Sequence, residues 1–408
     1  MKLNHGLHLA YCTNIHPAET WPETFDVLKR DTLQVRERVC PEQPYAIGLR
    51  LSRQAATELN ERSALLEFQR WLGQHHCYVF TINGFPYGQF HGARIKEQVY
   101  APDWTTPERL AYTKLLFDLL AQLVPADVEG SVSTLPCGFK RLVSSSEELR
   151  IIRDNLWSCV EHVARVSTQT GRCLHLGLEP EPMCLLETTS EVVQLFDRLR
   201  AEHRNDPRLA QHLGVNYDTC HLAVEFEEPS AAIGFLQQHK IKISKIHLSS
   251  ALRLRPTREA REALSSFADN IYLHQVVVRQ PDGRRVIYLD LDDALACERP
   301  MEDAAYPSSF SALDTQTFPE WRVHFHVPLH SAPTPIFGNT SDHILGVLDS
   351  LQANPALCSH LEMETYTWEV LPPEFKSWDV VEQLVAEYHW TLERLAERGL
   401  CHVQNTVN

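Results

Sequence analysis

Residues Cys173–His221 read CLHLGLEPEPMCLLETTSEVVQLFDRLRAEHRNDPRLAQHLGVNYDTCH, and no other stretch indicates the fold as directly. The stretch opens with a short apolar run, Cys173–Glu179, that has the length of a buried strand. An amphipathic segment, Ser190–Glu202, follows, and then a second apolar run, Leu213–Asp218. Two strands joined through a helix lie parallel in one sheet, because a parallel pair needs a crossover connection. This stretch is therefore predicted to be a strand–helix–strand unit.

The same alternation extends along the whole chain of 408 residues. It fits either a closed (β/α)₈ barrel or an open doubly wound sheet. No GxGxxG motif follows the first strand, which weakens the dinucleotide-binding option. We therefore predict an α/β fold, a single (β/α)₈ TIM barrel spanning residues 1–408. The other predicted strands are Leu7–Asn14, Ala46–Leu51, Cys77–Asn83, Glu129–Leu135, Lys242–Leu248 and Leu361–Tyr366, and further helices include Pro107–Leu123, Glu147–Thr168, Pro229–His239 and Val380–Leu395.

One region, about residues 250–340, interrupts this alternation of strands and helices. It is about ninety residues long, where a barrel needs roughly twenty to thirty. Within it, Tyr272–Arg279 and Arg285–Leu291 alternate around Pro281-Asp282-Gly283, which is a hairpin signal. We expect a long insertion after strand 7, on the catalytic side of the barrel, that contains a β-hairpin and is not an independent domain.

Composition narrows the class of function. The formal net charge is −15, and an acidic chain repels phosphate backbones, so no nucleic-acid partner is expected. The 11 cysteines are scattered and form no CxxC pair, a pattern typical of a reducing compartment. No apolar run is long enough to span a membrane. We expect a soluble, cytoplasmic protein.

Four predicted strands are mostly apolar along their length and end in ionisable residues. These strand ends are Leu178–Pro182, Tyr217–His221, Ile246–Ser249 and Leu361–Thr365. Taken singly, each of these side chains fits a helix cap or a solvated loop. In a (β/α)₈ barrel, however, the carboxyl ends of the strands meet in one mouth. Several carboxylates and imidazoles without a nearby lysine would repel one another there, and a divalent cation would relieve this.

These motifs resemble the xylose isomerase-like superfamily, which includes sugar isomerases and epimerases and the endonuclease IV family. The resemblance rests on Glu179-Pro180, Asp218-Thr219-Cys220-His221, His247 and Glu364-Thr365. It implies one divalent metal ion, Mn²⁺ or Zn²⁺ first, with Mg²⁺, Fe²⁺ and Co²⁺ as alternatives. Its ligands would be Glu179, Asp218, His247 and Glu364, with Glu179 and Glu364 also acting as catalytic acid and base. Glu181 and Glu362 lie two residues from a ligand on the same strand face, so either could replace its neighbour.

The substrate contacts are less sharply defined. Resemblance to the ketose 3-epimerases implies His221 and Arg253 as substrate-binding residues. The loop after the third strand contains Tyr87, His91 and Trp104, which suit either a substrate lid or a tight turn with packed aromatics.

A pair of histidines lies late in the insertion. His324-Phe325-His326 resembles the Asp-x-His that endonuclease IV uses for an additional metal, and alternation places both imidazoles on one face. An ordinary half-exposed strand fits this pattern equally well. The strand ends at Asn83 and Leu135 offer none of the further imidazoles that a three-metal nuclease centre needs.

The long loops add a biological context. Asn83–Gly88, His324–Pro328 and Glu362–Trp368 together resemble the EboE-type metabolite-traffic proteins. Those proteins are encoded beside a prenyltransferase-like membrane protein, which implies a membrane-protein partner and a part in secondary-metabolite processing or traffic. We predict a metal-dependent enzyme, isomerase- or epimerase-like, acting on a small polyhydroxylated or carbonyl-bearing metabolite. The alternatives are a metal-containing metabolite carrier without turnover and a metal-dependent hydrolase or lyase with the same ligands.

Overall fold

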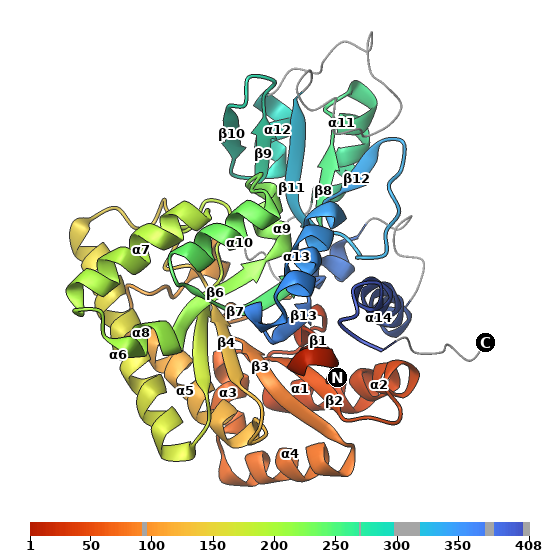
Figure 1. The fold of residues 1–408 in the computed structure, drawn as a ribbon. Helices are drawn as coiled ribbons and strands as arrows, with labels where there is room; N and C mark the ends of the chain where they lie inside the picture. The colour runs from red at the N-terminus through yellow and green to blue at the C-terminus, as the bar shows by residue number, and fades with distance from the viewer. Residues whose placement is uncertain (92–95, 269–270, 298–318, 372–378, 403–408) are drawn as a thin grey trace.

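The barrel is a sheet of eight parallel strands surrounded by helices (Figure 1). The computed structural model describes residues 1–91, 96–268, 271–297, 319–371 and 379–402. Strand order around the sheet is β1-β13-β7-β6-β5-β4-β3-β2, and one parallel bridge between Cys12 and Gly48 joins its two edges. The predicted (β/α)₈ fold is therefore confirmed. The strands are β1 (His8–Tyr11), β2 (Tyr45–Arg50), β3 (Cys77–Asn83), β4 (Gly130–Thr134), β5 (Leu174–Leu178), β6 (Leu213–Asp218), β7 (Lys242–Leu248) and β13 (His360–Met363).

Local signals fix where the surrounding helices begin. Ser145 and Glu148 form a capping box at the start of one helix, as do Thr188 and Glu191 at the next. Such boxes satisfy backbone N–H groups that have no partner within the helix. The helices of the barrel are α1 (Trp21–Val27), α2 (Leu33–Val39), α3 (Arg53–Leu59), α4 (Arg62–Gln74), α5 (Pro107–Leu123), α6 (Ser146–Thr170), α7 (Thr189–Glu202), α8 (Pro207–His212), α9 (Thr219–Val224), α10 (Pro229–Gln238), α13 (Ser341–Ala353) and α14 (Val380–Ala396).

The insertion between β7 and β13 forms a second, antiparallel sheet that projects from the barrel (Figure 1). Its strand order is β10-β9-β11-β8-β12. The predicted hairpin is confirmed, with Arg279 paired to Arg285 and Gly283 at a φ of +85° in the turn. The elements are β8 (Ala251–Leu254), α11 (Arg258–Leu264), β9 (Val276–Arg279), β10 (Arg285–Tyr288), α12 (Leu291–Cys297), β11 (Glu320–His326) and β12 (Phe337–Asn339).

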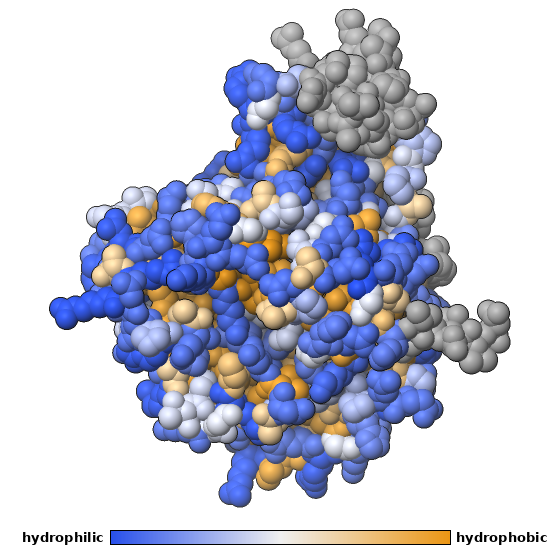
Figure 2. Space-filling model, viewed as in Figure 1, coloured by the Kyte–Doolittle hydropathy of each residue, from blue (hydrophilic) through white to orange (hydrophobic). Residues whose placement is uncertain are grey.

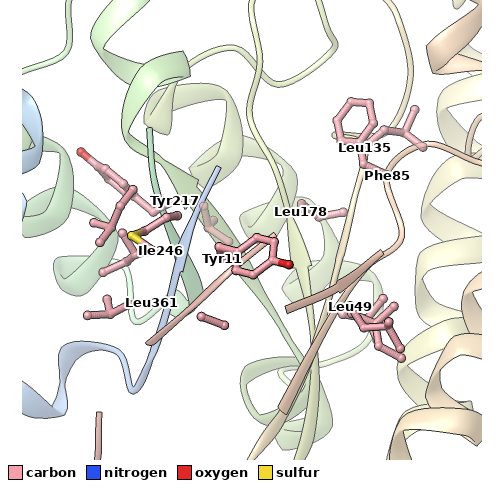
Figure 3. Packing of buried hydrophobic residues seen from close by; sticks show 14 of the residues in the cluster. Tyr11, Leu49, Phe85, Leu135, Leu178, Tyr217, Ile246 and Leu361 are labelled. Atoms are coloured by element: carbon pink, nitrogen blue, oxygen red, sulfur yellow. The ribbon is translucent and has the colours of Figure 1, made fainter. Parts of the chain in front are cut away.

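Apolar side chains from every barrel strand are buried in one large cluster. Figure 3 shows part of it, including Leu49, Leu178, Tyr217, Ile246 and Leu361. The surface seen in Figure 2 is mostly hydrophilic. Within the described ranges, no helix has both the length and the apolar character needed to cross a membrane. The core thus holds the strand ends rigidly, and these ends carry the ionisable residues.

Candidate metal centre

Four side chains from four neighbouring strands meet at the carboxyl end of the barrel. Glu179 follows β5, Asp218 ends β6, His247 lies near the end of β7, and Glu364 follows β13. One potential ligand atom from each lies within 4.8 Å of the others, and all four residues are buried. The structure therefore brings the four residues close enough together to share one metal ion.

In these carboxylates, one oxygen accepts hydrogen bonds from the protein and the other is available to a metal ion. Asp218 Oδ1 accepts hydrogen bonds from Ser249 Oγ at 2.7 Å and from the His221 N–H at 2.9 Å, whereas its Oδ2 has no hydrogen-bond partner among the described residues. Glu364 Oε1 accepts from the Asn14 and Asn83 amides at 2.7 and 3.1 Å. Glu179 Oε2 is likewise buried without a described hydrogen-bond partner. Buried oxygens without a donor are costly, so the chemistry of this set fits a divalent cation.

His247 has a different partner for each ring nitrogen. Its Nδ1 lies 3.1 Å from Glu179 Oε1, 3.4 Å from Asp218 Oδ2 and 3.2 Å from Glu364 Oε2. Its Nε2 lies 2.8 Å from Glu362 Oε2. A carboxylate behind a histidine in this way fixes the tautomer that leaves the opposite nitrogen for a metal. Glu362 is thus placed to orient the ligand, and Glu364 stands in the ligand cluster.

A lysine lies directly behind this cluster, contrary to the expectation that none would be near. Lys245 Nζ donates to Glu362 Oε2 at 2.5 Å and to Ser133 Oγ at 3.0 Å. Burial alone would raise the pKa of Glu362, but Lys245 and His247 together lower it to about 2. Room for this carboxylate comes from Gly48, where a Cβ atom would lie 2.0 Å from Glu362 Oε1. The spacing Lys245-Ile246-His247 carried this signal, because residues two apart share a strand face.

The charges around the four residues favour a bound cation. Burial lowers the pKa of His247, yet Glu364 and Glu179 raise it well above its usual value. The carboxylates thus attract a proton to the imidazole that they surround. Burial also raises the pKa of Asp218, but His221 and His247 bring it well below its usual range.

A second group of potential ligands adjoins the first. Glu181, His221 and His324 bring ligand atoms within 4.8 Å of one another, as do Asp218, His221 and His326. His326 Nδ1 lies 3.0 Å from the Glu364 carbonyl oxygen, and its buried Nε2 has no hydrogen-bond partner in the described part of the chain. His221 Nδ1 lies 3.0 Å from the Pro180 carbonyl oxygen. The insertion thus delivers two imidazoles to the mouth of the barrel.

A cavity opens toward solvent beside these clusters, and the empty space between its lining side chains and its mouth is about 540 Å³. Polar groups and aromatic rings share its wall. Its lining comprises Asn14, Asn83, Phe85, Pro86, Phe90, Lys96, Val99, Tyr100, Glu179, Glu181, His221, Tyr272, Leu273, His324, Glu364 and Tyr366.

Of the sequence-predicted substrate contacts, the structure places His221 in this wall and the other four outside it. Arg253 lies on β8, where its Nη1 donates to Asp342 Oδ2 at 3.0 Å. Trp104 is fully buried and donates to Thr134 Oγ1 at 3.2 Å. Tyr87 packs against Tyr112 and lines a separate groove. His91 Nε2 lies 2.7 Å from the Asn14 carbonyl oxygen, behind the wall.

Sequence reasoning missed most of the aromatic wall. Phe90 lies in the loop after β3, Tyr100 and Tyr366 lie in short 3₁₀ helices beyond strands, and Tyr272 belongs to the insertion. Their positions depend on how loops pack, which strand periodicity does not encode. Tyr366 alone carried a signal, because it follows the proposed ligand Glu364 by two residues.

No protein-family model matches the chain, and no curated protein matches its sequence. Solved structures do resemble it. A xylose isomerase-like TIM barrel protein from Mycobacterium smegmatis in complex with magnesium aligns at a TM-score of 0.54 and 11% identity, covering 98% of this chain and 99% of that one. An L-ribulose 3-epimerase aligns at 0.50 and 10%, covering 98% and 99%. The IolI protein with a bound zinc atom aligns at 0.48 and 14%, covering 96% and 99%. At these identities the first two matches show the fold alone: this chain is a TIM barrel whose architecture is similar to theirs.

Proposed function

We propose that this protein is a metal-dependent isomerase or epimerase acting on a small polyhydroxylated or carbonyl-bearing metabolite. The observation that carries the proposal is the convergence of Glu179, Asp218, His247 and Glu364, in which Glu179 and Asp218 each have one buried oxygen without a hydrogen-bond partner among the described residues. Fold alone would not support this, because one barrel serves many reactions. The proposed ion is Mn²⁺ or Zn²⁺ first, with Mg²⁺, Fe²⁺ and Co²⁺ as alternatives.

A bound divalent ion would polarise a substrate carbonyl and make the neighbouring C–H more acidic. Two carboxylates are placed to move that proton. Glu179 borders the cavity and has an oxygen without a donor, so it can accept a proton from carbon. Glu364 is oriented by Asn14 and Asn83 through one oxygen, which leaves the other for the reaction. His221 borders the same cavity and can bind a substrate oxygen.

Two measurements test this function. Elemental analysis of protein purified without chelator should give at least about one divalent ion per chain. In D₂O, the metal-loaded protein should then exchange a carbon-bound proton of dihydroxyacetone for deuterium, and Glu179→Gln should abolish the exchange. Bound metal without exchange on any carbonyl panel would favour the carrier alternative, whereas bond cleavage would favour the hydrolase or lyase.

The second cluster supports a further proposal, that His324 and His326 are ligands of an additional metal ion together with His221. Its support is the buried Nε2 of His326, which has no hydrogen-bond partner among the described residues, and the closeness of the three rings, whose centroids lie 4.6 to 5.7 Å apart. A stoichiometry near two ions that falls to one in His326→Phe would support it. A stoichiometry of one in both proteins would contradict it.

We propose a cytoplasmic role in secondary-metabolite processing or traffic, with a membrane protein from the same gene cluster as partner. Its support is the likeness of three loops to the EboE-type proteins. Co-purification of the protein with a prenyltransferase-like membrane protein encoded beside it would test the association. No co-purification from a strain that expresses both would contradict it.

A further inference from the structure

The aromatic part of the cavity wall is a cluster of three buried rings. Phe90, Tyr272 and Tyr366 come from the loop after β3, from the insertion and from the segment after β13. Their ring centroids lie 5.2 to 5.4 Å apart. Tyr366 also lies against His326, with ring centroids 4.6 Å apart. The cluster therefore joins the group of potential metal ligands directly.

The phenol groups of this wall are engaged by the protein. Tyr100 donates to Glu181 Oε1 at 2.7 Å, and the Tyr272 hydroxyl lies 2.9 Å from His91 Nδ1. The Tyr366 hydroxyl lies 3.5 Å from His324 Nε2. What these tyrosines offer to a ligand is therefore mainly their ring surface. Phe85, Pro86 and Leu273 extend the same apolar lining.

The charges of the cavity are unsuited to an anionic substrate group. Glu179, Glu181 and Glu364 all border it. No arginine is among the described residues of the lining, and the Lys96 ammonium group is paired with Asp290 Oδ2 at 2.5 Å. Phosphate recognition in proteins relies on arginine, lysine or backbone N–H groups. A phosphorylated sugar would thus face carboxylates and apolar rings.

A fully hydroxylated sugar also fits this wall poorly. Each hydroxyl that lost its water against an aromatic ring without gaining a partner would lower affinity about tenfold. An apolar group would gain there by leaving water. We propose, on the basis of the proposed function, that the substrate is uncharged and has two parts: adjacent carbonyl and hydroxyl oxygens that bind at the metal, and an apolar ring or chain that lies against Phe90, Tyr272 and Tyr366.

Binding of simple probes to the Co²⁺-loaded protein tests this substrate class, with the cobalt absorption spectrum as readout. The probes are 2-hydroxyacetophenone, dihydroxyacetone and dihydroxyacetone phosphate, which share a hydroxyketone. 2-Hydroxyacetophenone should bind about tenfold tighter than dihydroxyacetone or better, since its ring is buried. Dihydroxyacetone phosphate should bind no tighter than dihydroxyacetone. Acetophenone, which lacks the hydroxyl, should bind more weakly than 2-hydroxyacetophenone.

Variants of the aromatic wall test whether its rings cause the preference for 2-hydroxyacetophenone over dihydroxyacetone. Phe90→Ala and Tyr272→Ala should reduce the preference for 2-hydroxyacetophenone to less than about threefold while leaving cobalt content unchanged. Tyr87→Ala is the matched control, because Tyr87 belongs to the same loop as Phe90 but lies outside the cavity lining. Its preference should equal that of the wild type.

Three results would overturn the inference: equal or tighter binding of dihydroxyacetone, tighter binding of its phosphate, or an unchanged preference in both wall variants. A wild-type protein that takes up no cobalt would instead overturn the proposed function. The two failures are therefore distinguishable.

Discussion

Glu362 and Glu364 are two residues apart on one strand face, yet their environments suit them to different roles. Glu362 Oε2 contacts Lys245 Nζ and His247 Nε2, so its charge is balanced inside the barrel. Glu364 Oε1 is held by two neutral amides, those of Asn14 and Asn83, and its Oε2 faces His247 Nδ1 at 3.2 Å. A carboxylate already paired with a lysine is a poor metal ligand, whereas one held by amides remains available. The surroundings thus separate the orienting residue from the ligand.

Removing the negative charge of Glu362 should weaken metal binding without removing a ligand. In Glu362→Gln, His247 Nε2 loses its carboxylate partner and Lys245 loses its counter-charge, so the imidazole is oriented less firmly. We expect metal affinity to fall about 10- to 100-fold, measured by competition with a chromogenic chelator. Glu225→Gln is the control, because that equally buried carboxylate pairs with Arg285 away from the cluster. Equal metal affinity in wild type and Glu362→Gln would contradict the orienting role.

Arg253 provides a test of where the substrate lies. Its side chain reaches Asp342 rather than the cavity wall, so Arg253→Ala should change the affinity for 2-hydroxyacetophenone less than about twofold, because a solvated rim pair contributes little. His221→Ala, at the wall, should weaken the same binding at least about tenfold. Cobalt-detected titration of both variants measures this. Loss of binding in Arg253→Ala with normal cobalt content would restore the role that the resemblance implied.

Strand periodicity in the sequence predicts some elements of this structure and leaves others undetermined. The eight barrel strands and the hairpin of the insertion follow from local patterns, and β3, β6 and β7 have the predicted bounds. Convergence of Glu179, Asp218, His247 and Glu364 followed from the fold, because strand ends meet in the mouth. The choice between Glu362 and Glu364 did not follow, since it depends on Lys245 in β7 and on the amides of Asn83 in β3 and Asn14 just after β1. The aromatic wall depends on loop packing over long separations, for which no local pattern exists.

Strands β1, β5 and β13 carry three buried histidines that should make the protein sensitive to acid. Burial lowers the pKa of His8 and His175 to about 4, and it lowers the pKa of His360 well below its usual value. Unfolding returns each to about 6.5, so the unfolded chain binds more protons between these values. Stability is therefore full above pH 6.5 and declines as the pH falls toward 4, by about 3 kcal/mol each for His8 and His175.

Urea unfolding at pH 7 and at pH 4.5 measures this decline. His175→Gln should reduce the difference in free energy of unfolding between the two pH values by about 2 to 3 kcal/mol. The exposed His5 lies three residues before His8, and His5→Gln should leave the difference unchanged. An unaltered pH dependence in His175→Gln would show that the loss of stability in acid has another origin.

Taken as a whole, the molecule combines strand-end motifs that resemble those of endonuclease IV with a strongly negative net charge. Asp218-Thr219-Cys220-His221 and His247 by themselves would admit a DNA-repair enzyme of the endonuclease IV kind. At the end of β3, however, Asn83 donates its amide to Glu364. Beyond β4, Leu135 is fully buried in the apolar core. Neither position offers the imidazole that a three-metal phosphodiester site needs.

The net charge of −15 argues in the same direction, because counterion release from DNA requires cationic contacts. We therefore expect no cleavage of duplex DNA containing an abasic site, with Zn²⁺ or Mn²⁺ at the concentrations that saturate the protein. We also expect no DNA binding that weakens with added salt. A nicking assay with supercoiled and abasic substrates measures the cleavage, and fluorescence anisotropy across a salt series measures the binding.

Asp218→Ala separates true activity from a contaminating nuclease. Nicking that is present in the wild type and lost in this variant would overturn the assignment to a small metabolite. Nicking that is present in both proteins would come from another protein.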